Sequence, residues 1–230
     1  LKEWPPEGPP LLWQATGIGP GFSSVAVSGG RVYITGIIGG QTAISAFDME
    51  GTQLWQAPAG PAGPDGNHPG SRSSAVIDQG SLYLITGGGR IGCFDARTGA
   101  PRWSKEMSEF GGRPHNWGYA ESVLIYGDLA VVTPGGPRTV VALNKRTGQP
   151  VWASNGFNLP AHYGSLIAVE HQGTPMIVAG TGLGIIGVNA RNGAPLWWNR
   201  FSERNTANCP TPAYADGYVF WANEIGRADV

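Results

Sequence analysis

The sequence predicts an all-β fold of repeated four-stranded antiparallel sheets, and three observations support this prediction. A sequence motif made of a small residue, an Asp or Asn two positions later, a turn Gly and a closing Trp occurs four times. The closing tryptophans are 48, 49 and 45 residues apart, and another Trp lies 42 residues before the first. The chain also has 37 Gly and 19 Pro, which divide it into many short elements. A period in the forties with about four short strands per unit is typical of a β-propeller blade. The four copies of the motif are Ala46–Trp55, Cys93–Trp103, Ala142–Trp152 and Gly187–Trp197, and the earlier tryptophan is Trp13.

The composition excludes several classes of protein. A hydrophobic content of 41% and nine Trp are enough for a sizeable core. The formal net charge is -1 and only 13% of residues are charged, so there is no basic stripe for nucleic acid, and no nucleic-acid partner is expected. The most apolar run, 177–188, is short and interrupted by glycines, so no membrane span is expected. Residues 1–10 lack the apolar core of a signal peptide, so we expect that an export signal is either missing or lies upstream.

Turn signals cut each repeat into four short strands, which we name A to D in chain order. Glycine-rich turns separate short runs of apolar and β-branched residues, as in antiparallel hairpins. The predicted strands are 23–27, 31–37, 42–47 and 53–57 in the first blade; 73–77, 81–86, 91–94 and 101–105 in the second; 122–126, 130–133, 139–143 and 150–153 in the third; and 165–169, 175–179, 185–188 and 194–199 in the fourth. The corresponding blades span approximately 20–58, 70–107, 119–155 and 163–201.

The two ends of the chain predict an incomplete ring. Residues 10–17 resemble a D-type strand of the closing blade, and 209–230 supply a partial fifth blade with A and B strands but no C strand. We therefore expect about four and a half blades of a six- to eight-bladed ring, because a ring closes to remove its sheet edges. The alternative is a five-bladed ring closed by 10–17, and the missing C strand disfavours it.

The residues of the repeated motif have structural roles. The Asp or Asn side chain accepts backbone N–H bonds within the C–D turn, and the Gly supplies a positive φ. The closing Trp is broad enough to bridge to the neighbouring blade. A residue repeated in every blade suits packing better than a single active site, so we predict that these indoles dock one blade on another. The predicted docking residues are Trp13, Trp55, Trp103, Trp152 and Trp197.

The repeated motif resembles the tryptophan-docking motif of the PQQ-like, quinoprotein-type propeller repeats. The second and third copies keep its Thr-Gly pair, at Thr98-Gly99 and Thr147-Gly148, whereas the first copy is one residue shorter and the fourth has Asn192 in place of Thr. The resemblance implies the propeller fold over nearly the whole chain. It implies less about activity, because the family includes PQQ-dependent dehydrogenases as well as cofactor-free propellers such as the lipoprotein of the outer-membrane assembly machinery.

The candidate site lies in the D-to-A loops, where connections from successive blades converge. His68, His115 and His162 lie 13, 12 and 10 residues after the preceding docking Trp, and Asn208 lies 11 after. These equivalent positions predict a polar, partly aromatic face that binds a protein partner or a small ligand. The competing interpretation is that His and Asn simply suit solvated loops. The other residues predicted for this face are Arg72, Arg113, Asn116, Trp117, Glu121 and Tyr163.

An enzyme of this family would need more than these loops offer. The resemblance implies a Ca²⁺ with hard oxygen ligands beside the quinone, a carboxylate base and commonly a disulfide between adjacent cysteines. Glu121 and Asn208 are the oxygen ligands that the loops offer, and Asp65 is the conceivable base. The only cysteines, Cys93 and Cys209, are 116 residues apart. No catalytic residue, metal or cofactor is therefore predicted.

The sequence thus favours a non-catalytic scaffold that binds a protein partner or ligand through its loop face. A periplasmic or secreted location is implied by the family resemblance. Two alternatives stay open: a PQQ- and Ca²⁺-dependent dehydrogenase, and a structural subunit of a larger membrane-associated complex.

Overall fold

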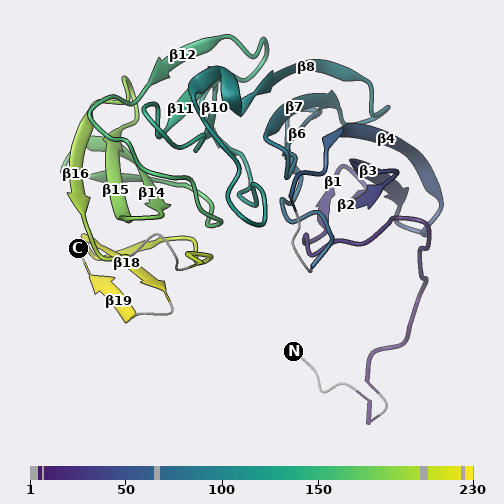
Figure 1. Ribbon diagram of the computed structural model, residues 1–230. Helices are drawn as coiled ribbons and strands as arrows, with labels where there is room; N and C mark the ends of the chain where they lie inside the picture. The colour runs from purple at the N-terminus through teal and green to yellow at the C-terminus, as the bar shows by residue number, and fades with distance from the viewer. Residues whose placement is uncertain (1–4, 7, 65–67, 203–206, 224–225, 230) are drawn as a thin grey trace.

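The computed structural model describes residues 5, 6, 8–64, 68–202, 207–223 and 226–229. These residues form four four-stranded sheets and one three-stranded sheet, and neighbouring strands pair antiparallel in chain order. Figure 1 shows the five sheets arranged around an open arc, with the first and the fifth at its two ends. The predicted all-β propeller of four-stranded antiparallel blades is confirmed.

The first four sheets contain the predicted strands, with ends that shift by a few residues. Each sheet has a short first strand, two longer middle strands and an outer strand that ends a repeat. The strands are β1 (Ala26–Ser28), β2 (Arg31–Ile38), β3 (Gln41–Asp48) and β4 (Gln53–Pro61); β5 (Val76–Asp78), β6 (Ser81–Ile85), β7 (Arg90–Asp95) and β8 (Pro101–Glu106); β9 (Leu124–Tyr126), β10 (Leu129–Val132), β11 (Val141–Asn144) and β12 (Pro150–Ala153); and β13 (Ile167–His171), β14 (Thr174–Thr181), β15 (Gly184–Asn189) and β16 (Pro195–Asn199).

The fifth sheet and the N-terminal segment differ from expectation. The fifth sheet contains β17 (Ala213–Ala215), β18 (Tyr218–Asn223) and also β19 (Gly226–Asp229), which pairs with β18 where no C strand was expected. The sequence Gly-Arg-Ala-Asp has no β-branched or aromatic residue, so only its pairing with β18 identifies it as a strand. Residues 10–17, expected as a D-type strand, join no sheet among the described residues.

The sheets lie around a common axis with their first strands innermost. β5 contacts both β1 and β9, and β9 also contacts β13. The middle strands are almost wholly buried, as in β6 and β15, whereas the outer strands alternate between half-buried and exposed residues. A sheet with two buried faces has to pack against a neighbour on each side, and this requirement builds the arc.

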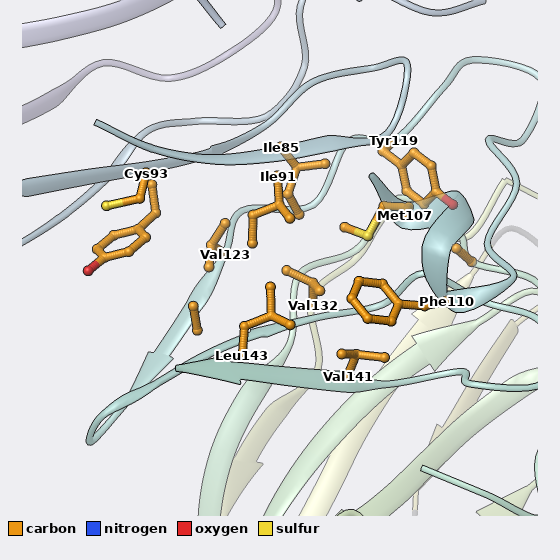
Figure 2. Packing of buried hydrophobic residues seen from close by; sticks show 13 residues of the cluster. Ile85, Ile91, Cys93, Met107, Phe110, Tyr119, Val123, Val132, Val141 and Leu143 are labelled. Atoms are coloured by element: carbon orange, nitrogen blue, oxygen red, sulfur yellow. The ribbon is translucent and has the colours of Figure 1, made fainter. Parts of the chain in front are cut away.

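Buried side chains between neighbouring sheets form the core. Figure 2 shows the cluster between the second and third sheets, where Ile85 and Ile91 face Val132 and Leu143. The short helix η1 (Met107–Phe110), which follows β8, adds Met107 and Phe110 to this cluster. At about 25 cal/mol per Å² of buried apolar surface, such contacts are the main stabilisation of the junction between two sheets.

Three of the tryptophans predicted to dock lie across sheet junctions. A Cβ placed on the turn glycines Gly99, Gly148 and Gly193 would lie 2.5–2.6 Å from the indoles of Trp55, Trp103 and Trp152, respectively. Each of these indoles therefore lies flat on the C–D turn of the next sheet. The Nε1 of Trp103 donates to the carbonyl oxygen of Lys145 at 2.9 Å, and that of Trp152 to Ala190 at 3.2 Å.

The two terminal tryptophans behave differently from each other. Trp13 lies on Gly51 and donates to the carbonyl oxygen of Met49 at 2.9 Å, so it docks even though 10–17 is not a strand. Trp197 packs over Gly187 of its own sheet and against the apolar cluster that joins the fourth and fifth sheets.

Candidate functional site

The antiparallel order places two kinds of connection at opposite ends of the sheets. The A–B and C–D turns lie at one end, and the B–C and D–A connections at the other. We call the second end the loop face. The candidate residues from the sequence lie in its D–A connections, which differ in length and sequence from sheet to sheet.

Residues from all five sheets meet in one hollow of about 430 Å³ on the loop face, which we call the axial hollow. Five of its lining residues occupy the same structural position, four residues before the first strand of each sheet begins. The repeat therefore converges five different side chains on one place. These residues are Phe22, Arg72, Ala120, Tyr163 and Cys209, and the remaining lining residues are His68, Trp117 and Ala207.

The axial hollow has aromatic walls and one fixed cation. The rings of Trp117 and Tyr163 lie 5.7 Å apart between centroids, and Phe22 is 64% exposed. The Arg72 guanidinium lies 5.5 Å from the centre of the Phe22 ring and donates to the carbonyl oxygens of Gly70 and His68 at 3.0 and 2.7 Å. A cation over an aromatic face, with two carbonyl partners, is held in place before any ligand arrives.

A second hollow of about 620 Å³, which we call the outer hollow, lies on the same face over the third sheet, between the connections that lead into and out of this sheet. Its polar side chains are Arg113, His115 and Asn158, and glycines and prolines supply the rest of its wall. His115 Nδ1 is hydrogen-bonded to the hydroxyl of Tyr163 at 2.6 Å. Because His115 lines the outer hollow and Tyr163 the axial one, this bond forms part of the wall between them.

Four of the predicted face residues are buried, and three of them line neither hollow. Glu121, His162 and Asn208 are 1%, 4% and 1% exposed. The Asn208 amide donates to the Thr181 carbonyl oxygen at 2.7 Å and to the Ser202 hydroxyl at 2.8 Å, and its backbone N–H donates to His162 Nδ1 at 3.2 Å. These side chains hold the loops in place and do not themselves reach the surface.

Burial changes the pKa of the titratable groups under the loops. Desolvation lowers the pKa of His162 to about 4, and the neighbouring His115 acts in the same direction. Desolvation also lowers the pKa of His115 and raises that of Glu121 to about 7, although the Thr133 N–H donates to Glu121 Oε1 at 2.7 Å. The two imidazoles beneath the loop face therefore favour the neutral form, and the pKa of the buried Glu121 carboxyl group lies near neutrality.

The remaining predicted residues are divided between the two hollows and the surface. Arg72, Trp117, Tyr163 and His68 line the axial hollow, Arg113 and His115 line the outer hollow, and Asn116 is exposed beside them. Phe22, Cys209 and Asn158 also line the hollows and were not predicted for this face. Counting residues back from the first strand of each blade, rather than forward from each Trp, would have aligned Phe22 and Cys209 with Arg72 and Tyr163.

The described residues do not fit a calcium and quinone site. Ca²⁺ takes about six to eight oxygen ligands in proteins. Asn208 Oδ1 already accepts from the Ser202 hydroxyl at 3.1 Å, and Glu121 offers one buried oxygen without a hydrogen-bond partner. Over the described part of the chain, no group of three or more His, Cys, Asp and Glu side chains is placed to hold a metal ion. Asp65, the conceivable base, lies outside the described residues.

Comparisons with known proteins agree with the architecture. A family model described as outer membrane protein assembly factor BamB matches residues 40–228. The outer membrane protein assembly factor BamB of Burkholderia pseudomallei (strain K96243) is 28% identical over 203 residues, which cover 84% of this chain and 49% of that protein. The chain thus spans about half the length of this curated relative.

Two solved structures share the fold. BamB from Moraxella catarrhalis has a TM-score of 0.63 and 21% identity, covering 90% of this chain and 57% of that one. A europium-containing methanol dehydrogenase has a TM-score of 0.65 and 14% identity, covering 93% and 50%. Because a BamB and a methanol dehydrogenase match with similar TM-scores at such low identity, these likenesses support the propeller and do not distinguish between activities.

Proposed function

The chain belongs to the BamB-like family of PQQ-like propeller repeats, and from this premise we propose that it is a non-catalytic scaffold that binds a protein partner through its loop face. The relative's name places that protein in outer-membrane protein assembly, and we propose the same process, in the periplasm, for this chain. Within the described part of the chain, no helix reaches the length and hydrophobicity that a membrane crossing requires.

The observation that carries the proposal is the convergence of five sheets on the axial hollow. Its exposed Phe22 and Trp117 are large apolar side chains on a surface, and such residues are typical anchors in protein interfaces. The core beneath it is rigid, because the junctions among the first four sheets are packed with apolar side chains and each is docked by a Trp. Rigid sheets that present different side chains around one hollow are suited to recognise one particular partner.

Photo-cross-linking in the native cells tests the proposal. A benzophenone amino acid in place of Phe22 is expected to form adducts with a protein of outer-membrane assembly. The matched control is the same amino acid in place of Arg97, an exposed residue of a C–D turn at the opposite end. Equal adducts at both positions, or none at position 22, would contradict the proposal.

A second measurement separates the scaffold from a quinoprotein. We expect no stoichiometric uptake of PQQ when the full-length protein is mixed with PQQ and Ca²⁺ and the quinone absorbance is recorded. Uptake at one quinone per chain would favour the dehydrogenase and reject the scaffold as the whole function.

A further inference from the structure

The two hollows of the loop face share an unbalanced positive charge. Arg72 lines the axial hollow and Arg113 the outer one, and no Asp or Glu lines either hollow among the described residues. Arg113 is exposed and makes no ion pair within the described ranges. A guanidinium presents several donors in a planar fork, which matches the geometry of a carboxylate.

The carboxylates near the hollows do not neutralise these arginines. Glu106 pairs with Arg90 at 2.6 Å, and Glu109 pairs with Lys105 at 3.1 Å. Glu121 lies beneath the surface, and burial raises its pKa toward neutrality. The charge on the loop face is therefore available to a ligand from outside.

The hollows adjoin each other across a fixed divider. The hydrogen bond between His115 and Tyr163 joins the two walls, and the His162 ring packs against His115 with 4.7 Å between ring centroids. Because His162 and Asn208 are buried and hydrogen-bonded beneath this pair, the divider is held from below. A chain that crosses it would meet apolar aromatic rings on one side and a polar hollow with Arg113 on the other.

We propose that the axial and outer hollows together form one groove for an extended polypeptide segment that carries carboxylates. An apolar or aromatic side chain of the segment occupies the axial hollow beside Phe22 and Trp117. Carboxylates of the segment pair with Arg113 and Arg72. This inference rests on the proposed scaffold function and specifies the chemistry of its partner.

A random library of 12-residue peptides displayed on phage and selected against the purified chain tests the proposal. Twelve extended residues span about 40 Å, which is long enough to cross a protein face of this size. The selected peptides are expected to combine Asp or Glu with an aromatic or large apolar residue. Failure to enrich any peptide, or enrichment of neutral or basic sequences, would overturn the proposal.

A double-mutant cycle then assigns the charge contact. Arg113→Ala is expected to weaken the binding of a selected peptide about tenfold or more, because it removes hydrogen bonds to a charged group. Replacing the acidic residues of the peptide by Asn or Gln should weaken its binding to a similar extent. Arg113→Ala should then have little further effect on the binding of this neutral peptide. Arg191→Ala, which removes an exposed arginine from a C–D turn at the opposite end, is the matched control and should change nothing. Equal losses with Arg113→Ala and Arg191→Ala would overturn the assignment.

The two proposals fail separately. Adducts at position 22 together with charge-independent peptides would keep the scaffold function and reject the acidic segment. Acidic peptides that depend on Arg113, without a cellular adduct at position 22, would keep the groove and reject the proposed function.

Discussion

The two ends of the sheets differ in how much they repeat. At the C–D turns, Asp48, Asp95 and Asn144 each accept backbone N–H bonds within their own turn, and a glycine follows on which a Trp of another part of the chain lies. At the loop face, the five aligned positions of the axial hollow hold five different residues. A residue repeated in each sheet solves a packing problem that each sheet has. Different residues that converge on one hollow make a surface that no single sheet has alone.

The largest expected effect is the loss of a docked indole. Trp152 is 8% exposed and donates to the Ala190 carbonyl oxygen, so Trp152→Ala should lower the free energy of unfolding by about 3–5 kcal/mol. Trp198→Ala is the matched control, because Trp198 lies on the same kind of outer strand but is 45% exposed, and it should cost about 1 kcal/mol or less. Urea denaturation of both variants measures the difference, and equal losses would reject docking as the basis of the repeat.

A smaller effect is expected from the buried carboxyl under the loop face. Because the folded pKa of Glu121 is raised to about 7 from 4.5, its proton stabilises the folded state fully below about pH 4.5, and this stabilisation is lost as pH rises to about 7. The free energy of unfolding of Glu121→Gln, measured relative to the parent chain at the same pH, should therefore be about 3 kcal/mol higher at pH 8 than at pH 4.5. The packing cost of the neutral amide is the same at both pH values and cancels.

His162 acts in the opposite direction. Its folded pKa is lowered to about 4 from 6.5, so its contribution to stability is present above about pH 6.5 and is lost as pH falls toward 4. In the parent chain the two groups offset each other over this range. Urea titrations of Glu121→Gln should consequently show stability that rises with pH between about 4 and 6.5. The same pH profile in the variant and the parent would show that Glu121 is not buried as described.

The turn glycines allow a finer test of the docking end. Gly193 and Gly173 have nearly the same positive φ, +72° and +75°, but a Cβ would meet Trp152 at Gly193 and nothing within 4 Å at Gly173. Both Ala variants carry the backbone strain, and Gly193→Ala should cost about 1–3 kcal/mol more because it displaces the indole. Thermal or urea unfolding of the pair measures this excess. If the two variants are equally destabilised, the close contact with Trp152 contributes nothing.

The smallest effect on stability is expected at the loop face. Trp117 is 36% exposed and borders the axial hollow, so Trp117→Ala should change the free energy of unfolding by about 1 kcal/mol or less. A loss as large as that of Trp152→Ala would mean that the two ends do not differ as described.

The fold could be predicted from the sequence because its signals are local and repeated. Turn glycines and apolar runs mark every strand of the first four sheets, and the tryptophan spacing gives the period. β19 was missed because its residues carry no strand signal. Residues 10–17 were expected to form a strand because they contain Trp13, but this Trp docks without being part of a sheet.

The site could be predicted only in part. The spacing from each Trp identified the loops that line the two hollows, but it does not reveal which way a side chain points within a loop. Glu121, His162 and Asn208 therefore appeared as surface residues, although they are buried. Phe22 was missed because it looks like an ordinary apolar residue until five sheets bring its position together with Arg72 and Tyr163.

The most direct test of the contrast between the two ends combines binding with stability in one variant. Trp117→Ala is introduced into the full-length protein that carries the benzophenone amino acid in place of Phe22, and adduct yield in cells is measured beside the free energy of unfolding of the purified protein. We predict that the partner adduct is largely lost while the free energy of unfolding stays within about 1 kcal/mol of the parent. An unchanged adduct yield in a stable protein would contradict the account, because the hollow that differs from sheet to sheet would then not be where the partner binds.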